Sequence, residues 1–338
     1  MQLIRTVLRS CVMRAGIAFI TIMAGAVLNT PAWAKIIEFD PPGSTQTYPM
    51  AINASGWIAG FYGDDQGNDH GFLRDPNGTI TTIDAAGAEC GTFPWAINRS
   101  GTIAGWASDS SCNAHGFFRT NDGTVTIFDA PGAIGTFGIA LNNKGTITGQ
   151  YVDANQNVPG FVRTTDGTIT SFAPMGSINT QPNSINKSGV VAGSFEDSNK
   201  IWHGFVRAAS GKLMTFDAPG AISTYALSVN ESGEISGYYR VNASTQYGFV
   251  RLPDGTMTSV DPDDSNEVSA TAINNGDIVT GYFSDGNTYD GFVQSADGTI
   301  VTFAIGVSTN PTAINSKGKI TGYFFGGDEA SHGFLRKH

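Results

Sequence analysis

One short motif returns at an almost constant interval along this chain and limits the folds open to it. The asparagine of an Ala-Ile-Asn-like motif recurs 41 to 45 residues apart, at Asn53, Asn98, Asn142, Asn186, Asn230, Asn274 and Asn315. A glycine follows each asparagine seven residues later, from Gly60 to Gly322, and a Gly-Phe pair comes after that. A fixed period of roughly 20 to 50 residues is typical of repeat architectures, in which each copy is one supersecondary unit.

Each copy has the pattern of four short strands, A to D. In the first copy their ranges are 47–53, 57–62, 70–75 and 79–84, separated by Gly-containing turns. Asx-Gly turns between alternating apolar runs are strong hairpin signals. Four antiparallel strands in a copy of about 44 residues are typical of a β-propeller blade, whereas β-solenoid repeats usually have fewer strands and a shorter period. The repeats start near residues 47, 92, 136, 180, 224, 268 and 309.

The last copy favours the propeller over the solenoid. It stops at residue 338, just after its strand C, and residues 36–43 (IIEFDPPG) match the strand D ending of the second copy, IFDAPG. We therefore predict an all-β, seven-bladed β-propeller with four antiparallel strands per blade, whose last blade is closed by the N-terminal strand. This closure would remove both sheet edges and tie the two ends of the chain together.

The first 34 residues predict a secretory signal peptide. Three arginines precede a 14-residue apolar run at 15–28, and Ala32-Trp33-Ala34 supplies small residues for cleavage after Ala34. An uncleaved signal anchor is the alternative, although the apolar run is short for a membrane span. We expect a secreted or periplasmic protein in which residues 35–338 form a single propeller domain with no membrane span.

Charge and composition exclude several kinds of partner. The formal net charge of −10 becomes −13 once the three arginines of residues 1–34 are removed. Such an acidic chain lacks the basic footprint of proteins that bind nucleic acid or anionic lipid. The sequence contains no dinucleotide fingerprint, P-loop, Gly-x-Ser-x-Gly elbow or His-Glu-x-x-His motif. We expect no cofactor, and a monomer.

Histidine and aspartate recur 14 residues apart on strands C and D. A three-residue turn between these strands sets Arg74 opposite Ile80, which extends to His70 opposite Asp84. The same offset pairs His115 with Asp129 and His203 with Asp217, and the split copy pairs His332 with Asp40. Because a catalytic site is normally unique, we interpret these as structural hydrogen-bonded pairs rather than acid/base dyads. In the fifth copy Tyr247 replaces histidine opposite Asp261 and could donate instead.

The arginine of the Gly-Phe-x-Arg motif recurs in six copies, and phenylalanine in all seven. We assign the phenylalanines to the core between blades. The arginines could form a polyanion site, but contacts to carbonyls or carboxylates between blades are the preferred interpretation.

Two further residue sets are candidates for ligands. Aspartates follow the strand B glycine by four residues at Asp64, Asp109, Asp153, Asp197 and Asp285, and are weak calcium candidates because their loops lack EF-hand alternation. Aromatic residues lie early in strand A, where a collar could stack on sugars or pack between blades: Tyr48, Phe93, Trp95, Phe137 and Tyr225. The loops B–C and D–A vary most, so we expect a ligand site on their face.

Cys90 and Cys112 remain after signal cleavage and lie in loops on that same face. We predict a disulfide between them at the junction of the first two blades, since exported proteins reside in oxidising compartments. A zinc site is disfavoured because no His-rich loop is nearby.

The combined motifs Asn-x-Ser-Gly-x-Ile-x-Gly, His-Gly-Phe-Leu-Arg and Asp-Gly-Thr resemble those of the bacterial extracellular HAF repeat family, over residues 36–336. The signature of that family is His-Ala-Phe, and here glycine stands in the middle, as at Gly71. The resemblance implies an exported, propeller-like repeat protein and no particular activity.

Three functions remain open. The leading hypothesis is a non-catalytic binding or scaffold module for a glycan, a protein or the cell envelope. The alternatives are a polysaccharide hydrolase or lyase with its site at the channel mouth, and a structural component of an extracellular matrix.

Overall fold

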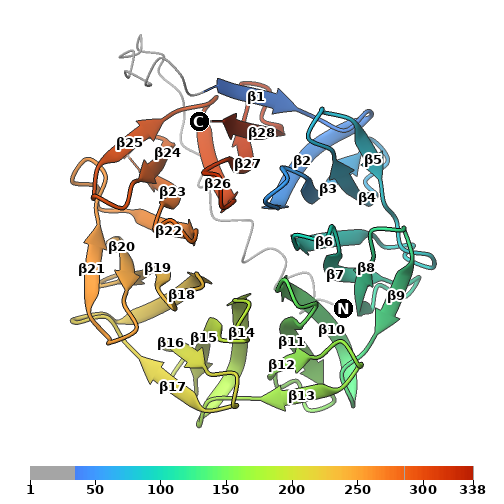
Figure 1. Ribbon diagram of the computed structural model, residues 1–338, viewed down its shortest axis with the longest axis horizontal. Coiled ribbons are helices and arrows are strands. Elements are labelled where there is room, and N and C mark those ends of the chain that lie inside the picture. Colours follow the sequence, from blue (N-terminus) through green and yellow to red (C-terminus); the bar gives the residue numbers. More distant parts are fainter. Residues whose placement is uncertain (1–34, 285, 338) are drawn as a thin grey trace.

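A computed structural model of the protein describes residues 35–284 and 286–337, which contain 28 strands and no helix. The strands form a ring of sheets around a central opening (Figure 1). The predicted signal peptide, residues 1–34, lies outside the described residues. In the described part of the chain there is no helix of the length and hydropathy that a membrane crossing requires.

The strands follow one another in sets of four, here called units. Unit 1 contains β2 (Ser44–Ile52), β3 (Ile58–Asp64), β4 (Asp69–Arg74) and β5 (Ile80–Thr82). Unit 2 contains β6 (Thr92–Ile97), β7 (Ile103–Ser108), β8 (Ala114–Arg119) and β9 (Val125–Phe128). Unit 3 contains β10 (Ala133–Leu141), β11 (Ile147–Asp153), β12 (Gly160–Arg163) and β13 (Ile169–Phe172). Units 4 and 5 contain β14 (Ser177–Ile185), β15 (Val191–Asp197), β16 (Trp202–Arg207), β17 (Leu213–Phe216); β18 (Ser223–Val229), β19 (Ile235–Arg240), β20 (Gln246–Arg251), β21 (Met257–Val260). Units 6 and 7 contain β22 (Val268–Ile273), β23 (Val279–Ser284), β24 (Tyr289–Gln294), β25 (Ile300–Phe303); β26 (Ser308–Ile314), β27 (Ile320–Phe325), β28 (Ser331–Lys337), β1 (Lys35–Phe39).

Within each unit the four strands are antiparallel neighbours. Strand A lies nearest the central opening and strand D at the periphery (Figure 1). Units 6 and 7 share one sheet only through a single parallel bridge, Tyr289 to Ser308. The outer strand of unit 7 is β1, which pairs with β28 from Lys35 opposite Lys337 to Phe39 opposite Gly333. The first and last strands of the described chain are therefore neighbours in one sheet.

The predicted strands are present, with shifted ends. In unit 1 strand A begins at Ser44, three residues earlier than expected, and strand D is only Ile80–Thr82. The predicted register between strands C and D is confirmed, with Arg74 opposite Ile80 and Phe72 opposite Thr82.

A β-bulge in every strand A determines which side chains face the central opening. In unit 1 the register shifts between Pro49 and Ala51, so Met50 is the extra residue. The strand B glycine lies opposite: a Cβ on Gly60 would collide with the carbonyl oxygen of Tyr48 and with Pro49. Equivalent collisions with the strand A backbone occur in all seven units, at Gly60, Gly105, Gly149, Gly193, Gly237, Gly281 and Gly322. The sevenfold glycine is therefore required by close backbone approach at a bulge.

The core lies between units. The phenylalanine of each Gly-Phe pair is at most 1% exposed: Phe72, Phe117, Phe161, Phe205, Phe249, Phe292 and Phe334. The motif arginines are structural as well. Arg251 donates to the carbonyl of Leu252 at 3.1 Å, and its guanidinium lies 4.7 Å from the ring centre of Phe216 in the preceding unit. Aromatic rings, rather than the carboxylates considered above, are thus the inter-unit partners of most of these arginines.

Candidate ligand-binding site at the channel mouth

The seven repeated asparagines form a closed ring of hydrogen bonds around the channel. The side-chain nitrogen of each asparagine donates to the backbone carbonyl of the equivalent asparagine in the next unit, beginning with Asn53 to Asn98 at 3.1 Å. The remaining donors follow in order: Asn98, Asn142, Asn186, Asn230 and Asn274. Asn315 then donates to the carbonyl of Asn53 at 2.9 Å, which joins the last unit to the first.

The same asparagines fold the A–B turns. In unit 3 the Asn142 Oδ1 atom accepts the backbone N–H groups of Lys144 and Thr146, each at 3.0 Å. These turns also need one residue with positive φ, which is glycine in most units (Gly145, φ 85°) and Asp277 in unit 6 (φ 56°). All seven asparagines are buried, at 3–6% exposure. Each side chain therefore satisfies backbone groups of two units, which is a structural role.

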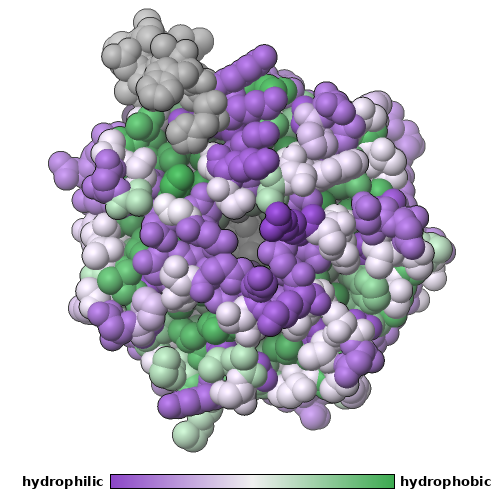
Figure 2. Space-filling model, viewed as in Figure 1, coloured by the Kyte–Doolittle hydropathy of each residue, from purple (hydrophilic) through white to green (hydrophobic). Residues whose placement is uncertain are grey.

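The residue after each asparagine lines a cavity at this end of the channel. Its volume is about 460 Å³, and the residues in that position are Ala54, Arg99, Asn143, Lys187, Glu231, Asn275 and Ser316. We call this set, together with Lys317, the channel mouth. Hydrophilic residues gather around the central opening in Figure 2. Every unit contributes, so the mouth exists only in the assembled ring.

Deeper in the channel the bulge residues of strand A line a second cavity of about 340 Å³. They are Met50, Trp95, Ile139, Asn183, Leu227, Thr271 and Thr312, and we call this set the channel throat. The two cavities share lining residues such as Ile97 and Leu141, so mouth and throat adjoin each other. The polar mouth therefore lies next to a throat that is lined on part of its wall by apolar side chains.

The predicted aromatic collar is mostly packed between units. Tyr48, Phe93 and Phe137 are 5–9% exposed and belong to one hydrophobic cluster with Phe61 and Trp106. Tyr225 is half-buried and stacks on Tyr238, with ring centres 4.5 Å apart. Of the five candidates, Trp95 lines the throat. Its neighbours in the collar have no face left for a sugar.

The structure brings together all four predicted histidine–aspartate pairs. The Nδ1 atom lies 2.9 Å from an aspartate oxygen in His70–Asp84, His115–Asp129 and His203–Asp217, and 2.7 Å away in His332–Asp40. A second carboxylate faces Nε2 in each case, at 3.3 to 3.7 Å, from Asp64, Asp109, Asp197 and Asp328. We call each three-residue group a clasp. In unit 5, by contrast, Tyr247 donates no hydrogen bond to Asp261 and packs against Tyr239.

The calcium candidates serve as turn caps. Asp64 Oδ1 accepts the N–H groups of Gln66 and Asn68 at 2.9 and 2.8 Å. The hydrogen bond from the Asn68 side chain, together with these backbone N–H groups, lowers the pKa of Asp64 to about 2. Asp109, Asp153 and Asp197 likewise each accept two backbone N–H groups of their own turn. Asp285 lies outside the described residues. In the described residues no group of three or more His, Cys, Asp or Glu side chains could hold a metal ion.

One pair of carboxylates converges beside the mouth. Glu234 and Asp277, from units 5 and 6, both accept from the Asn230 side-chain nitrogen, at 2.7 and 3.2 Å. Partial burial raises the pKa of Glu234, and the neighbouring Asp277 raises it further. Neither carboxylate lines the mouth cavity.

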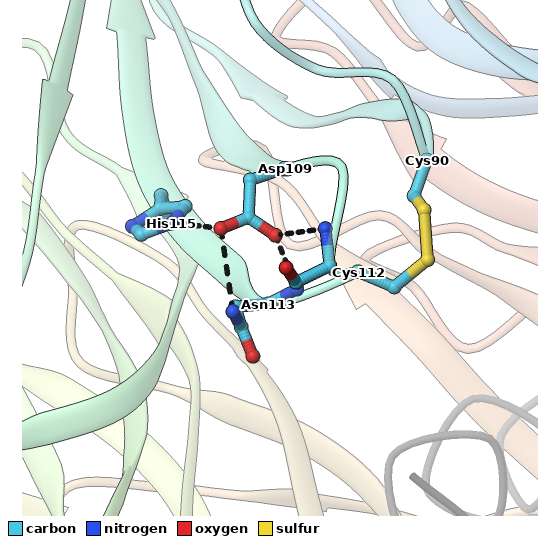
Figure 3. Close-up of a disulfide and its surroundings, with 6 residues drawn as sticks. Cys90, Asp109, Cys112, Asn113 and His115 are labelled. Atoms are coloured by element: carbon cyan, nitrogen blue, oxygen red, sulfur yellow. Dashed lines mark hydrogen bonds and ion pairs between the residues drawn. A yellow bond between two sulfur atoms is a disulfide. The ribbon is translucent and has the colours of Figure 1, made fainter.

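Cys90 and Cys112 form a disulfide with Cα atoms 5.3 Å apart. It joins the β5–β6 loop to the β7–β8 turn, and Figure 3 shows Asp109 and His115 of the unit 2 clasp next to it. Cys112 has positive φ (59°) in a turn capped by Asp109. The disulfide thus anchors the first inter-unit loop to the clasp of the next unit.

The position of the cavity differs from the sequence expectation. We expected a ligand site among the varied B–C and D–A loops, whereas the mouth cavity opens among the uniform A–B turns. The signal that could have located it is the residue after each repeated asparagine, which differs in almost every copy while the asparagine before it is constant.

No protein-family model matches the chain, and no curated protein matches it. Solved structures do share its arrangement of strands. A streptogramin B lyase superimposes with a TM-score of 0.60 at 16% identity, covering 90% of this chain and 99% of the lyase. The β-propeller domain of the Trilobed protease from Pyrococcus furiosus gives 0.63 at 13% identity, with 86% and 97% covered. The chain has a propeller fold. At these identities the likeness establishes the fold of the propeller and leaves its function to be argued from the site.

Proposed function

We propose that this protein is an exported, non-catalytic binding module whose ligand enters the channel mouth of a ring-closed, seven-bladed propeller. The observation that carries the proposal is the mouth cavity, built from one variable residue in each unit on a ring of invariant asparagines. A constant scaffold that carries variable side chains into one concave site is typical of a recognition site.

The chemistry of the histidines supports binding over catalysis. All four clasp histidines are held by two carboxylates, and they belong to strand C rather than to the channel lining. The resemblance to HAF repeats and the N-terminal segment support export to the periplasm or the medium. A glycan, protein or envelope component is the proposed class of partner.

A screen for ligands would test the binding function. The processed protein would be applied to an array of bacterial and plant glycans and to cell-envelope fractions, beside an Ala54→Trp variant whose indole fills the mouth. We expect at least one ligand to bind the wild-type protein and to lose at least tenfold in affinity with the variant. Equal binding by both proteins would place the ligand elsewhere and contradict the proposed site.

A second candidate function is a polysaccharide hydrolase or lyase, favoured by the convergence of Glu234 and Asp277 on the Asn230 side-chain nitrogen beside the mouth. Two neighbouring carboxyl groups are the usual acid/base arrangement of glycoside hydrolysis. Release of reducing or unsaturated ends from polysaccharides, abolished by Glu234→Gln, would support this candidate. Unchanged release by the Glu234→Gln variant would exclude Glu234 as its catalytic acid.

A further inference from the structure

Free basic side chains are concentrated around the channel mouth of an otherwise acidic protein. Sixteen lysines and arginines follow residue 34, and six of them are the structural arginines of the Gly-Phe-x-Arg motifs. Five of the other ten lie in A–B turns: Arg99, Lys144, Lys187, Lys317 and Lys319. Within residues 35–284 and 286–337 none of these five side chains forms an ion pair. Cations that form no ion pair are therefore concentrated in the A–B turns, and three of the five, Arg99, Lys187 and Lys317, line the mouth.

The neutral residues of the mouth add hydrogen-bond donors. Asn143 Oδ1 accepts the backbone N–H of Arg99 at 2.9 Å, and Asn275 Oδ1 accepts that of Glu231 at 3.0 Å. These bonds use the amide oxygens and leave both side-chain NH₂ groups to face a ligand. The carboxylate of Glu231, the one acidic side chain among the mouth residues, already accepts the N–H of Lys187 at 3.0 Å. The mouth thus offers donors and positive charge, which suit an anion.

The throat below the mouth offers apolar surface. Met50, Trp95, Ile139 and Leu227 supply it from four units. The polar throat residues are engaged with neighbouring units. Asn183 donates to the carbonyl of Ala226 at 2.8 Å, and Thr271 and Thr312 donate to carbonyls at 2.9 and 2.7 Å. A ligand that passes the mouth therefore meets mainly hydrocarbon and the Trp95 indole.

We propose that the channel binds a small organic anion, whose carboxylate is held at the mouth by Arg99, Lys187 and Lys317 and whose apolar body or sugar ring reaches Trp95. This inference rests on the proposed function and adds the chemical class of its ligand. Cavities of about 460 and 340 Å³ lie within the size range of small-molecule sites. A carboxylate in this position would form ion pairs with these three cationic side chains.

Matched acid and neutral probes test the proposal. Calorimetric titrations of the processed protein would compare hexanoate with hexanamide and galacturonate with galactose, and so separate fatty acids from acidic sugars as the source of the carboxylate. We expect the acid of at least one pair to bind at least tenfold more tightly than its neutral partner, with affinity falling as salt is added.

Two charge-matched variants locate the site. Arg99→Gln/Lys187→Gln/Lys317→Gln should weaken binding of the acid at least tenfold, whereas Lys35→Gln/Lys200→Gln/Lys212→Gln should leave it within twofold. Equal loss in both variants, or binding of neither acid, would overturn the proposal. Equal binding of the acid and the neutral probe, blocked by Ala54→Trp, would overturn the anionic class while supporting the mouth as the ligand site.

Discussion

The clasps of His70, His115 and His332 make single side chains respond to pH, because the pKa of each of these histidines is raised. Each ring has a carboxylate at both nitrogens, and a neutral imidazole carries only one N–H. The hydrogen bond that His115 donates to Asp129 raises the pKa of the histidine, and partial burial opposes this effect less strongly. The hydrogen bond that His332 donates to Asp40 likewise raises the pKa of that histidine. Protonation is therefore the state in which a clasp makes both of its hydrogen bonds.

We predict that the free energy of unfolding decreases as the pH rises from 5.5 to 8.5. A pKa that is higher in the folded than in the unfolded protein gives stability that is complete below the unfolded pKa and is lost above the folded one. Because these three clasps are partly exposed, each should contribute about 0.2–1 kcal/mol. Urea unfolding of the wild-type protein and of His115→Gln/His332→Gln at both pH values would measure this. The prediction fails if the double variant keeps the full pH slope.

The ring of buried asparagines also depends on single side chains, since each one bonds to the next unit. We predict that Asn142→Asp lowers the free energy of unfolding by about 1–3 kcal/mol. Aspartate keeps the oxygen that caps the turn but sets a second oxygen against the carbonyl of Asn186 in place of the donor. The exposed Asn155→Asp, whose side chain caps nothing, is the matched control and should change stability by less than about 0.5 kcal/mol. Denaturant titration gives both values, and equal effects would argue against the ring.

At the scale of elements, the strand pairing of β1 with β28 joins the ends of the described chain. We predict that a processed protein lacking residues 35–40 melts at a lower temperature and aggregates. The truncation exposes the edge of β28 and removes the aromatic contact between Phe39 and Phe72. A synthetic peptide of residues 35–43 should restore part of the lost melting temperature. Unaltered melting of the truncated protein would show that the pairing contributes little.

The disulfide links two loops rather than two strands. We predict that Cys90→Ser/Cys112→Ser lowers the free energy of unfolding by about 3 kcal/mol, since the bond closes a short segment of the unfolded chain. Reductant should lower the melting temperature of the wild-type protein and leave that of the variant unchanged. Two titratable thiols in the folded, oxidised protein would contradict the prediction.

At the scale of the whole molecule, the pairing of β1 with β28 bears on the oligomeric state. We predict that the exported protein begins at Lys35 and sediments as a monomer, since β1 already occupies the open edge of β28 and leaves no strand partner to be supplied by another chain. N-terminal sequencing of the protein recovered from the periplasm or medium, with light scattering of the purified sample, would check this. A start before residue 30, or a dimer, would contradict it.

Regular features of the chain were predictable because they depend on local chemistry that recurs. The turn residues, the alternation of the strands and the constant offset of His115 from Asp129 determine hairpins and register within about 20 residues. The same regularity predicted that the N-terminal strand would lie beside the last copy. The repeat did not predict that its constant asparagines would bond to one another's backbones around the channel.

The proposed ligand site depends on the tertiary structure. The channel mouth combines one residue from each of seven turns about 44 positions apart, and such residues become neighbours only when the ring brings strands A together. The bulge opposite Gly60 turns Met50 toward the channel, and its equivalent in unit 2 does so for Trp95, whereas the nearby Phe93 is buried. The sequence by itself determined the repeating sheet, because hairpin chemistry is local. Which side chains meet around the axis depends on packing between units, because that surface belongs to no single copy.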